Sequence, residues 1–102
     1  MCSIFCCTGK DVSKERMERC FYRTLSRGPD MTSFEETPGG WMGFHRLAIM
    51  GLNAAGMQPF ALNGNMLVCN GEIYGFRSLK RKLEGKGYVF RSDSDCEILL
   101  PL

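Results

Sequence analysis

The chain has 102 residues, of which 44% are hydrophobic, and its 13 Lys and Arg residues nearly balance its 11 Asp and Glu residues. The formal charge of +2 excludes a nucleic-acid-binding protein recognised by charge alone, and no apolar run reaches the roughly 18 residues of a membrane-spanning helix. Domains most often contain about 100 to 150 residues, so the chain has room for one small domain or a piece of one.

The first half of the chain is predicted to form a strand, a helix and a hairpin. Residues 3–7 are a short β-prone run, and residues 13–25 carry apolar side chains at spacings of three and four, as in an amphipathic helix. Residues 31–36 and 41–49 alternate on either side of the turn at 37–40, which predicts an antiparallel hairpin.

The second half is predicted to begin with a loop and a second hairpin. Residues 50–59 contain Gly, Asn and Pro and indicate a loop, and the strands 60–62 and 66–69 flank the turn dipeptide Asn63-Gly64.

The C-terminal third is predicted to be mainly helical. We expect a charged surface helix over 76–84 that is ended by the glycines after it, and a short strand over 88–90. A last helix over 96–100 is expected to begin after the N-capping residues of 92–95. The predicted fold class is α+β with a mainly antiparallel sheet. The final run, 97–102, is apolar and lacks a polar or glycine-rich tail, which indicates that the chain is only part of a domain.

The six cysteines are distributed as expected for a protein of the reducing cytoplasm. Residues 1–12 lack the charged and apolar regions of a signal peptide, so a disulfide framework is not expected. We expect Cys7, Cys20, Cys69 and Cys96 to be small buried hydrophobic residues. Their spacing makes no CxxC pair, and we predict no metal site.

Cys2 is the residue with the clearest chemical potential. Methionine aminopeptidase generally removes Met1 before a small second residue, which would give Cys2 a free α-amine. Such an amine has a pKa of about 7.7 to 8.0, so it can accept the thiol proton near neutral pH without help from a histidine. The alternative is that Cys2 merely follows the start codon, and composition alone favours that alternative.

Six short motifs place Cys2 in a wider context. They are Met1-Cys2-Ser3-Ile4-Phe5, Arg27-Gly28-Pro29-Asp30, His45-Arg46-Leu47-Ala48-Ile49, Gln58-Pro59, Asn70-Gly71-Glu72-Ile73-Tyr74 and Ser94-Asp95-Cys96-Glu97. In this order and rough spacing they resemble the N-terminal glutaminase domain of glutamine-hydrolysing asparagine synthetases, which is a class II glutamine amidotransferase domain. The resemblance covers the whole chain.

The resemblance implies a fold, a reaction and partners. The fold would be that of the N-terminal nucleophile hydrolases, a four-layer αββα sandwich of which residues 1–102 form only the N-terminal part. The domain would hydrolyse glutamine to glutamate and ammonia in the cytoplasm, with no cofactor of its own. The ammonia would go to a C-terminal synthetase domain, absent here, that uses ATP and magnesium to convert aspartate to asparagine. Neither nucleic acid nor membrane is an expected partner.

The resemblance also implies roles for individual residues. Cys2 would be the nucleophile, and the Asn70 side-chain amide and Gly71 N–H would stabilise the oxyanion. Arg46 would bind the α-carboxylate of glutamine, and Glu72 and Asp95 would bind its α-ammonium group. The pocket beside Arg46 would be shaped by Leu47, Ala48, Ile49 and Met50.

Each of these residues also has an interpretation that involves no ligand. Arg46 could extend from a strand into solvent, and Asp95 could only cap a helix. Asn70-Gly71 could be a hairpin turn, but the segment after it leads toward a helix and offers no pairing strand. The basic residues of 77–86 are interpreted as a solvated helix face.

Two positions depart from the family pattern. Cys6 stands where relatives commonly have glycine, so Cys6 or Cys7 could crowd the pocket or form a disulfide with Cys2. His45 lies one position later than in many relatives, and strand alternation puts it on the face opposite Arg46. We therefore assign it no catalytic role, with a Cys-His pair as the alternative mechanism.

The alternatives for the whole chain are a non-catalytic glutamine-binding or interaction module, and a glutaminase that serves another acceptor. Strands that lack the rest of a domain would expose an apolar face and open edges, so we also expect self-association, for instance as a homodimer.

Overall fold

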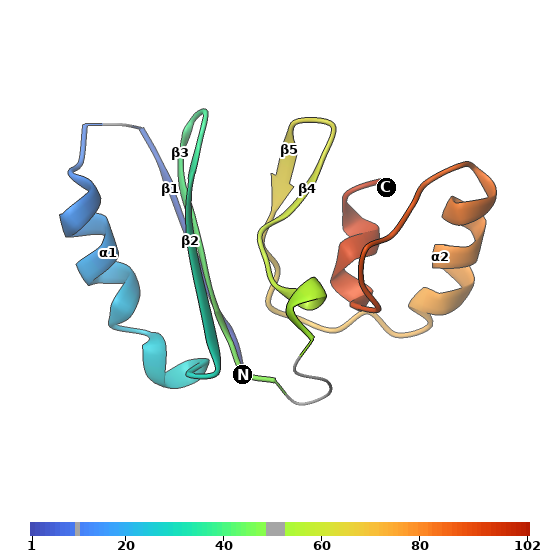
Figure 1. Ribbon diagram of the computed structural model, residues 1–102, viewed down its shortest axis with the longest axis horizontal. Coiled ribbons are helices and arrows are strands. Elements are labelled where there is room, and N and C mark those ends of the chain that lie inside the picture. The colour runs from blue at the N-terminus through green and yellow to red at the C-terminus, as the bar shows by residue number, and fades with distance from the viewer. Residues whose placement is uncertain (10, 49–52) are drawn as a thin grey trace.

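The computed structural model describes residues 1–9, 11–48 and 53–102, which form two sheets (Figure 1). The larger sheet contains three antiparallel strands in the order β1, β3, β2; their bounds are Ser3–Thr8, Gly40–Arg46 and Met31–Thr37. The smaller sheet is the hairpin of β4, Phe60–Leu62, and β5, Asn65–Leu67. The predicted strand 3–7 and both predicted hairpins are confirmed.

The helices lie outside the two sheets. In Figure 1, α1 (Lys14–Tyr22) covers one side of the larger sheet, and the β4–β5 hairpin lies on its other side. Beyond the hairpin lie α2 (Phe76–Gly85) and the 3₁₀ helix η3 (Asp95–Leu99). The order of layers is therefore helix, sheet, sheet, helix, and the class is mixed α and β, as predicted.

Helix α1 is attached to the larger sheet by an aromatic cluster. Ser13 caps the helix by accepting a hydrogen bond from the Arg16 amide at 3.3 Å. Phe21 is buried and its ring stacks on His45 with centroids 3.7 Å apart. A Cβ at Gly43 would lie 2.8 Å from the Phe21 ring, so glycine leaves the space that the ring occupies. Burial of this cluster is what holds the helix on the sheet.

The strand register divides the larger sheet into two faces. Ser3 pairs with His45 and Phe5 pairs with Gly43, and all four lie on the face covered by α1. By alternation Ile4, which pairs with Phe44, lies on the opposite face, which we call the inner face because the β4–β5 hairpin lies on that side.

The second hairpin forms around the predicted turn. Asn63 and Gly64 both have positive φ angles, 50° and 81°, as a two-residue type I′ turn requires. Phe60 is buried in this hairpin. Strand β5 ends at Leu67, two residues earlier than predicted, and beyond it the Cys69 backbone is hydrogen-bonded to the Gln58 side chain instead of a strand.

The predicted strand over 88–90 is wrong. The Tyr88 amide donates to Leu83 O at the end of α2, and the Arg91 amide donates to the Glu97 carboxylate at 2.8 Å. The segment finds hydrogen-bond partners in a helix end and a side chain, so its β-prone residues form no ladder among the described residues.

The helix predicted over 76–84 is confirmed as α2, whereas the other two predicted helices differ in extent or type. The predicted 13–25 helix is α1 followed by the separate 3₁₀ helix Leu25–Arg27, and the predicted 96–100 helix is η3. The prediction that Cys20 is buried is also wrong, because it lies about 100° around the helix from Phe21 and is exposed. Among the described residues no helix has both the length and the hydropathy needed to cross a membrane.

Candidate active site

Cys2 lies directly before β1, at the point where the larger sheet ends. Continued by one residue, the register that pairs Ser3 with His45 brings Cys2 opposite Arg46, on the inner face. The Cys2 side chain is half-buried, and its Sγ accepts a hydrogen bond from the Leu47 amide at 3.4 Å. The same Sγ lies 3.8 Å from Leu47 O, so the thiol is held beside the backbone of Leu47 at the end of β3.

The motif at 27–30 supports this end of the sheet. Gly28 packs so closely on β3 that a Cβ would lie 2.3 Å from His45 O. This contact lets Asp30 accept the Ala48 amide on Oδ2 at 2.8 Å, while Arg27 Nε donates to Cys2 O at 3.4 Å. The hydrogen bonds end β3 at Arg46, three residues earlier than predicted, because the amides that follow bind Cys2 Sγ and Asp30.

The Arg46 guanidinium turns toward the 3₁₀ helix Ala54–Gly56. Its Nη1 donates to Asn53 O at 2.7 Å and lies 3.9 Å from Met31 Sδ. The side chain is half-buried on the same face as Cys2, so it is held at the site rather than extended into solvent. Leu47 and Ala48 follow it and are half-buried, whereas the predicted pocket residues Ile49 and Met50 lie outside the described residues.

The segment that carries Asn70 and Gly71 is exposed and is held through its backbone. Cys96 Sγ donates to Gly71 O at 3.4 Å, and Asp95 Oδ2 accepts the Ile73 amide at 2.5 Å. The Asn70 side chain is exposed and makes no hydrogen bond to any residue that the structure describes. Its amide is therefore available to a ligand.

The two acids predicted to bind the ligand, Glu72 and Asp95, differ in their surroundings. The Glu72 side chain is exposed, without a hydrogen bond inside the described ranges. Asp95 uses one carboxylate oxygen to hold Ile73, so it positions the loop in addition to any contact with substrate. Neither acid shares a hydrogen bond with Cys2 or Arg46, so these contacts form two groups, one at the end of β3 and one beside η3.

His45 belongs to the core. Its ring is fully buried, accepts from Thr32 Oγ1 on Nδ1 at 2.9 Å, and donates from Nε2 to Phe21 O at 3.1 Å. This arrangement lies on the face opposite Cys2, as alternation predicted. The geometry gives no support to a Cys-His pair.

The neighbouring cysteines do not reach Cys2. Cys6 is four strand residues from Cys2, about 13 Å along β1, whereas a disulfide requires Cα atoms within about 7 Å. Cys7 lies on the face toward α1 and its Sγ approaches Thr8 O at 3.7 Å. All six cysteines are free thiols, and burial raises the pKa of Cys6. A disulfide of Cys6 or Cys7 with Cys2, which the sequence left open, is incompatible with this strand.

Comparison with known sequences identifies the family. The model of the glutamine amidotransferase domain matches residues 1–102. The chain belongs to this family. A probable glutamine-hydrolysing asparagine synthetase of Acanthamoeba polyphaga mimivirus is 39% identical over 110 residues, which cover 100% of this chain and 20% of that protein. Glutamine-hydrolysing asparagine synthetase 1 of Bacillus subtilis is 40% identical over 78 residues, covering 74% of this chain and 12% of the relative.

The relatives are much longer than this amidotransferase domain and do not all carry one name. The amidase chry2 of Gibberella zeae is 34% identical over 92 residues, covering 86% of this chain and 14% of that protein. The chain thus spans a fifth or less of the length of these curated relatives. No solved structure matches it.

Sequence reasoning missed three supporting residues of this amidotransferase domain. They are Asp30, which holds Ala48; Gln58, which holds Cys69; and Glu97, which accepts the Arg91 and Ser92 amides and the Ser92 hydroxyl. Glu97 could have been noticed as an acid within an apolar run, since a buried carboxylate requires partners. For Gln58 the signal is its position before a proline at a strand end.

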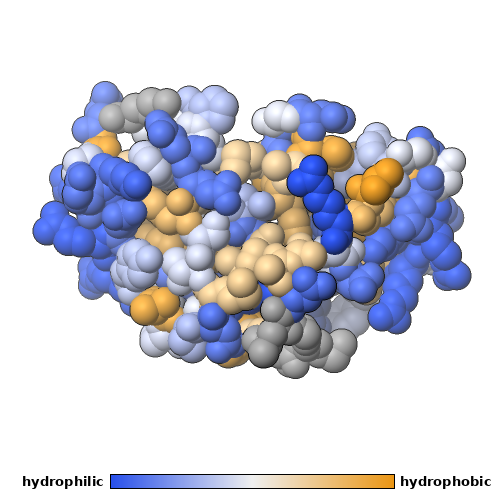
Figure 2. Space-filling model, viewed as in Figure 1, coloured by the Kyte–Doolittle hydropathy of each residue, from blue (hydrophilic) through white to orange (hydrophobic). Residues whose placement is uncertain are grey.

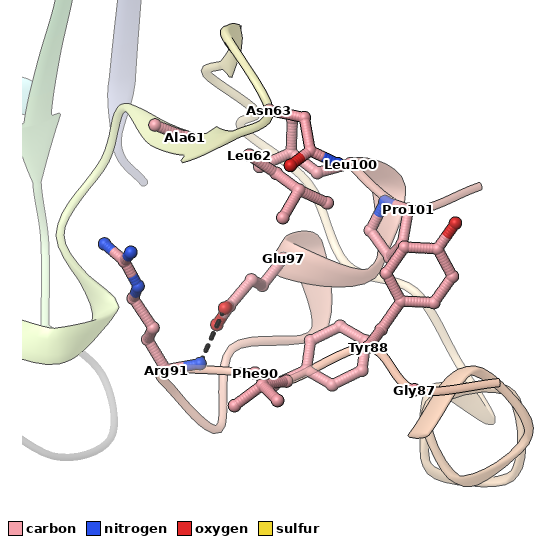
Figure 3. A pocket seen from close by; sticks show the side chains of 11 residues that line it. Ala61, Leu62, Asn63, Gly87, Tyr88, Phe90, Arg91, Glu97, Leu100 and Pro101 are labelled. Atoms are coloured by element: carbon pink, nitrogen blue, oxygen red, sulfur yellow. Dashed lines mark hydrogen bonds between the residues drawn. The ribbon is translucent and has the colours of Figure 1, made fainter. Parts of the chain in front are cut away.

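A hollow of about 490 Å³ lies apart from the predicted site, between β4, the segment after α2 and η3 (Figure 3). It is lined by side chains such as Leu62, Tyr88 and Leu100, and by none of the predicted site residues that the structure describes. In Figure 3 the Glu97 carboxylate binds the Arg91 amide while the Arg91 side chain points away from it. Within the described parts of the chain no group of three His, Cys, Asp or Glu side chains is arranged to hold a metal ion.

Proposed function

We propose that this amidotransferase domain hydrolyses the side-chain amide of glutamine, with Cys2 as nucleophile and its own α-amine as base after removal of Met1. The observation that carries the proposal is the family match over residues 1–102 together with the position of Cys2 beside Arg46 on the inner face. Met1 is 68% exposed, so an aminopeptidase can reach it.

The reaction proceeds through a thioester. The amine accepts the thiol proton, the thiolate attacks the amide carbon, and the oxyanion receives hydrogen bonds from the Asn70 amide and the Gly71 N–H. The protonated amine then gives its proton to the leaving ammonia. Water attacks the thioester, the same amine accepts a proton from that water, and glutamate leaves as the Cys2 thiol is restored.

Recognition of glutamine uses charge. The Arg46 guanidinium pairs with the α-carboxylate, and Glu72 and Asp95 pair with the α-ammonium group. Leu47 and Ala48, which follow Arg46 and are half-buried, are assigned to the space beside it. The half-buried position of Arg46 supports this assignment, because a partly shielded charge binds its counter-ion more strongly than an exposed one.

The layer order of helix, sheet, sheet, helix supports assignment of the fold to the N-terminal nucleophile hydrolases. In the longer protein the ammonia would pass to a C-terminal synthetase domain that activates aspartate with ATP and magnesium and forms asparagine. The names of the two synthetase relatives and the small share of their length that is matched support this role.

The test is release of glutamate and ammonia from glutamine by the chain with Met1 removed. Cys2→Ala is expected to abolish hydrolysis while glutamine still binds by calorimetry, and Cys2→Ser to leave very little, because a hydroxyl is a much weaker nucleophile than a thiol of pKa about 8.5. Cys6→Ala, on the same face of the same strand, is the matched control and should keep activity.

The role of the amine is tested by comparing the glutaminase activity of protein with and without Met1, with the N-terminus identified by mass spectrometry. Protein that retains Met1 or an N-terminal tag should be inactive, and full activity with Met1 attached would refute the amine as base. Glutamine binding without hydrolysis in the parent chain would indicate a binding module instead.

A further inference from the structure

Gln58 occupies the position where the small sheet would continue. Phe60 pairs with Leu67 in the β4–β5 hairpin, so the same antiparallel register places residue 58 opposite Cys69. The backbone pairing stops before this position, since β4 begins at Phe60 and β5 ends at Leu67.

The Gln58 side chain replaces the missing pairing. Its Nε2 donates to Cys69 O at 3.0 Å, and its Oε1 accepts the Cys69 amide at 2.5 Å. A primary amide thus supplies the donor and the acceptor that a strand residue would have offered. Gln58 is only 5% exposed, so water has little access to take over these hydrogen bonds if the side chain is removed.

The residue held in this way directly precedes Asn70 and Gly71. Gly71 O accepts from Cys96 and the Ile73 amide donates to Asp95, so the backbone is fixed on both sides of the proposed oxyanion donors. A Cβ at Gly71 would lie 4.0 Å from Cys69 Sγ, so these two residues are close. Displacement of Cys69 would move Asn70 and Gly71 with it.

We propose that Gln58 is a positioning residue for glutamine hydrolysis, because its side-chain amide clamps the Cys69 backbone and so holds the Asn70 and Gly71 donors where the oxyanion forms. The inference rests on the proposed function. Oxyanion donors act by being in place before charge develops, so a small displacement lowers the rate of the chemical step more than the binding of the ground state.

The experiment compares Gln58→Leu and Gln58→Glu with the parent chain in glutamine hydrolysis. Leucine removes both hydrogen bonds, whereas glutamate has the same size and keeps the acceptor but replaces the donor with an oxygen that repels Cys69 O. For both variants kcat should fall about 10- to 100-fold, less than the roughly 100- to 1,000-fold loss that follows removal of an oxyanion donor, while KM changes less than about threefold. Asn65→Ala, an exposed amide on the same hairpin, is the control and should behave as the parent.

Two further measurements separate positioning from loss of fold. Alkylation of Cys2 by iodoacetamide needs no oxyanion donor, so its rate should stay within about twofold of the parent in a folded variant. Amide hydrogen exchange at Cys69 and Gly71 should be faster in Gln58→Leu than in Asn65→Ala.

The outcomes are distinct. An active parent with unchanged kcat in both Gln58 variants overturns the positioning role. Equal losses in kcat and in Cys2 alkylation overturn it as well, since they indicate general unfolding. An inactive parent chain overturns the proposed function and with it the catalytic consequence of Gln58, and the exchange rates at Cys69 and Gly71 then show whether the clamp itself exists.

Discussion

Cys2, Arg46 and Leu47 come together because β1 begins beside the end of β3. One residue beyond the end of β3, the Leu47 amide binds a sulfur instead of a carbonyl. A strand end is a favourable place for a nucleophile, because its neighbouring amides are no longer committed to a partner strand. The same geometry explains why His45, adjacent to Arg46 in sequence, takes no part: it faces the opposite side.

Arg46 is proposed to bind the α-carboxylate of glutamine. In active enzyme, Arg46→Ala should raise KM for glutamine about 10- to 100-fold, because a hydrogen bond to a charged group contributes about 1.5 to 3 kcal/mol. Steady-state kinetics measures the change. Arg23→Ala, an exposed arginine after α1, is the control, and an unchanged KM for Arg46→Ala would remove Arg46 from the site.

Cys96 makes stability depend on pH. Burial, a hydrogen bond with the Cys69 side chain and the charge of Asp95 raise the pKa of Cys96 above its ordinary value of 9.0. The folded state therefore keeps the proton that the unfolded state loses first, so the stabilisation is complete below pH 9 and declines as pH rises above it. Urea unfolding from pH 7 to 10 should show the free-energy difference between the parent and Cys96→Ala shrinking with pH. Parallel profiles would contradict this.

At the scale of elements, the 27–30 segment determines where β3 ends. Gly28 allows the backbone to approach His45 and Arg46, and Asp30 then captures the Ala48 amide. The ladder cannot continue, and the chain leaves the sheet beside Cys2. A short connecting segment thus determines the shape of the site by taking hydrogen bonds away from a strand.

Gly28→Ala tests this arrangement. The added Cβ would lie 2.3 Å from His45 O and 2.8 Å from the Arg46 carbonyl carbon, both backbone atoms, so the segment must shift. We expect a loss of about 1 to 3 kcal/mol in the free energy of unfolding, together with lower glutaminase activity. Gly39→Ala, where nothing lies within 4 Å of the new Cβ, should be close to neutral. Equal stability of the two variants in chemical denaturation would show that the approach is not needed.

At the scale of the whole molecule, the described fold is open. Its radius of gyration is 14.4 Å, whereas a compact domain of 100 residues has about 13 Å. Figure 2 shows apolar surface gathered along the middle of one face, between the two sheets, with hydrophilic surface on either side. Within the described ranges, strands β1 and β2 each pair on one side only, and Ile4 is 47% exposed. Open edges and apolar surface of this kind favour association.

The 102-residue chain is therefore expected to self-associate. In size-exclusion chromatography with light scattering, its mass should exceed 11.5 kDa and rise with concentration. The variant Val89→Ser is the control for nonspecific hydrophobic contact, because it replaces an apolar side chain that is 85% exposed. A cooperative monomer at all concentrations would contradict the expectation.

The sequence by itself determined the elements whose signals are local. The Asn63-Gly64 turn, the apolar spacing within 13–25 and the alternation around 37–40 predicted two hairpins and a helix, because backbone preference and side-chain period act within a few residues. The motif order also indicated the family, since it depends only on residue identities. Alternation correctly separated His45 from Arg46.

Only the tertiary structure decided where these elements stop and which groups hold the site. The ends of β3 and β5 depend on Asp30 and Gln58, which belong to other segments and whose hydrogen bonds form only when the chain folds. The same holds for residues 88–90. They have high β propensity, but hydrogen bonds to Leu83 and Glu97 hold this segment outside any described strand. A backbone N–H or C=O can find its hydrogen-bond partner anywhere in the fold. The local pattern therefore predicts that a strand forms, and side chains from other segments determine its length.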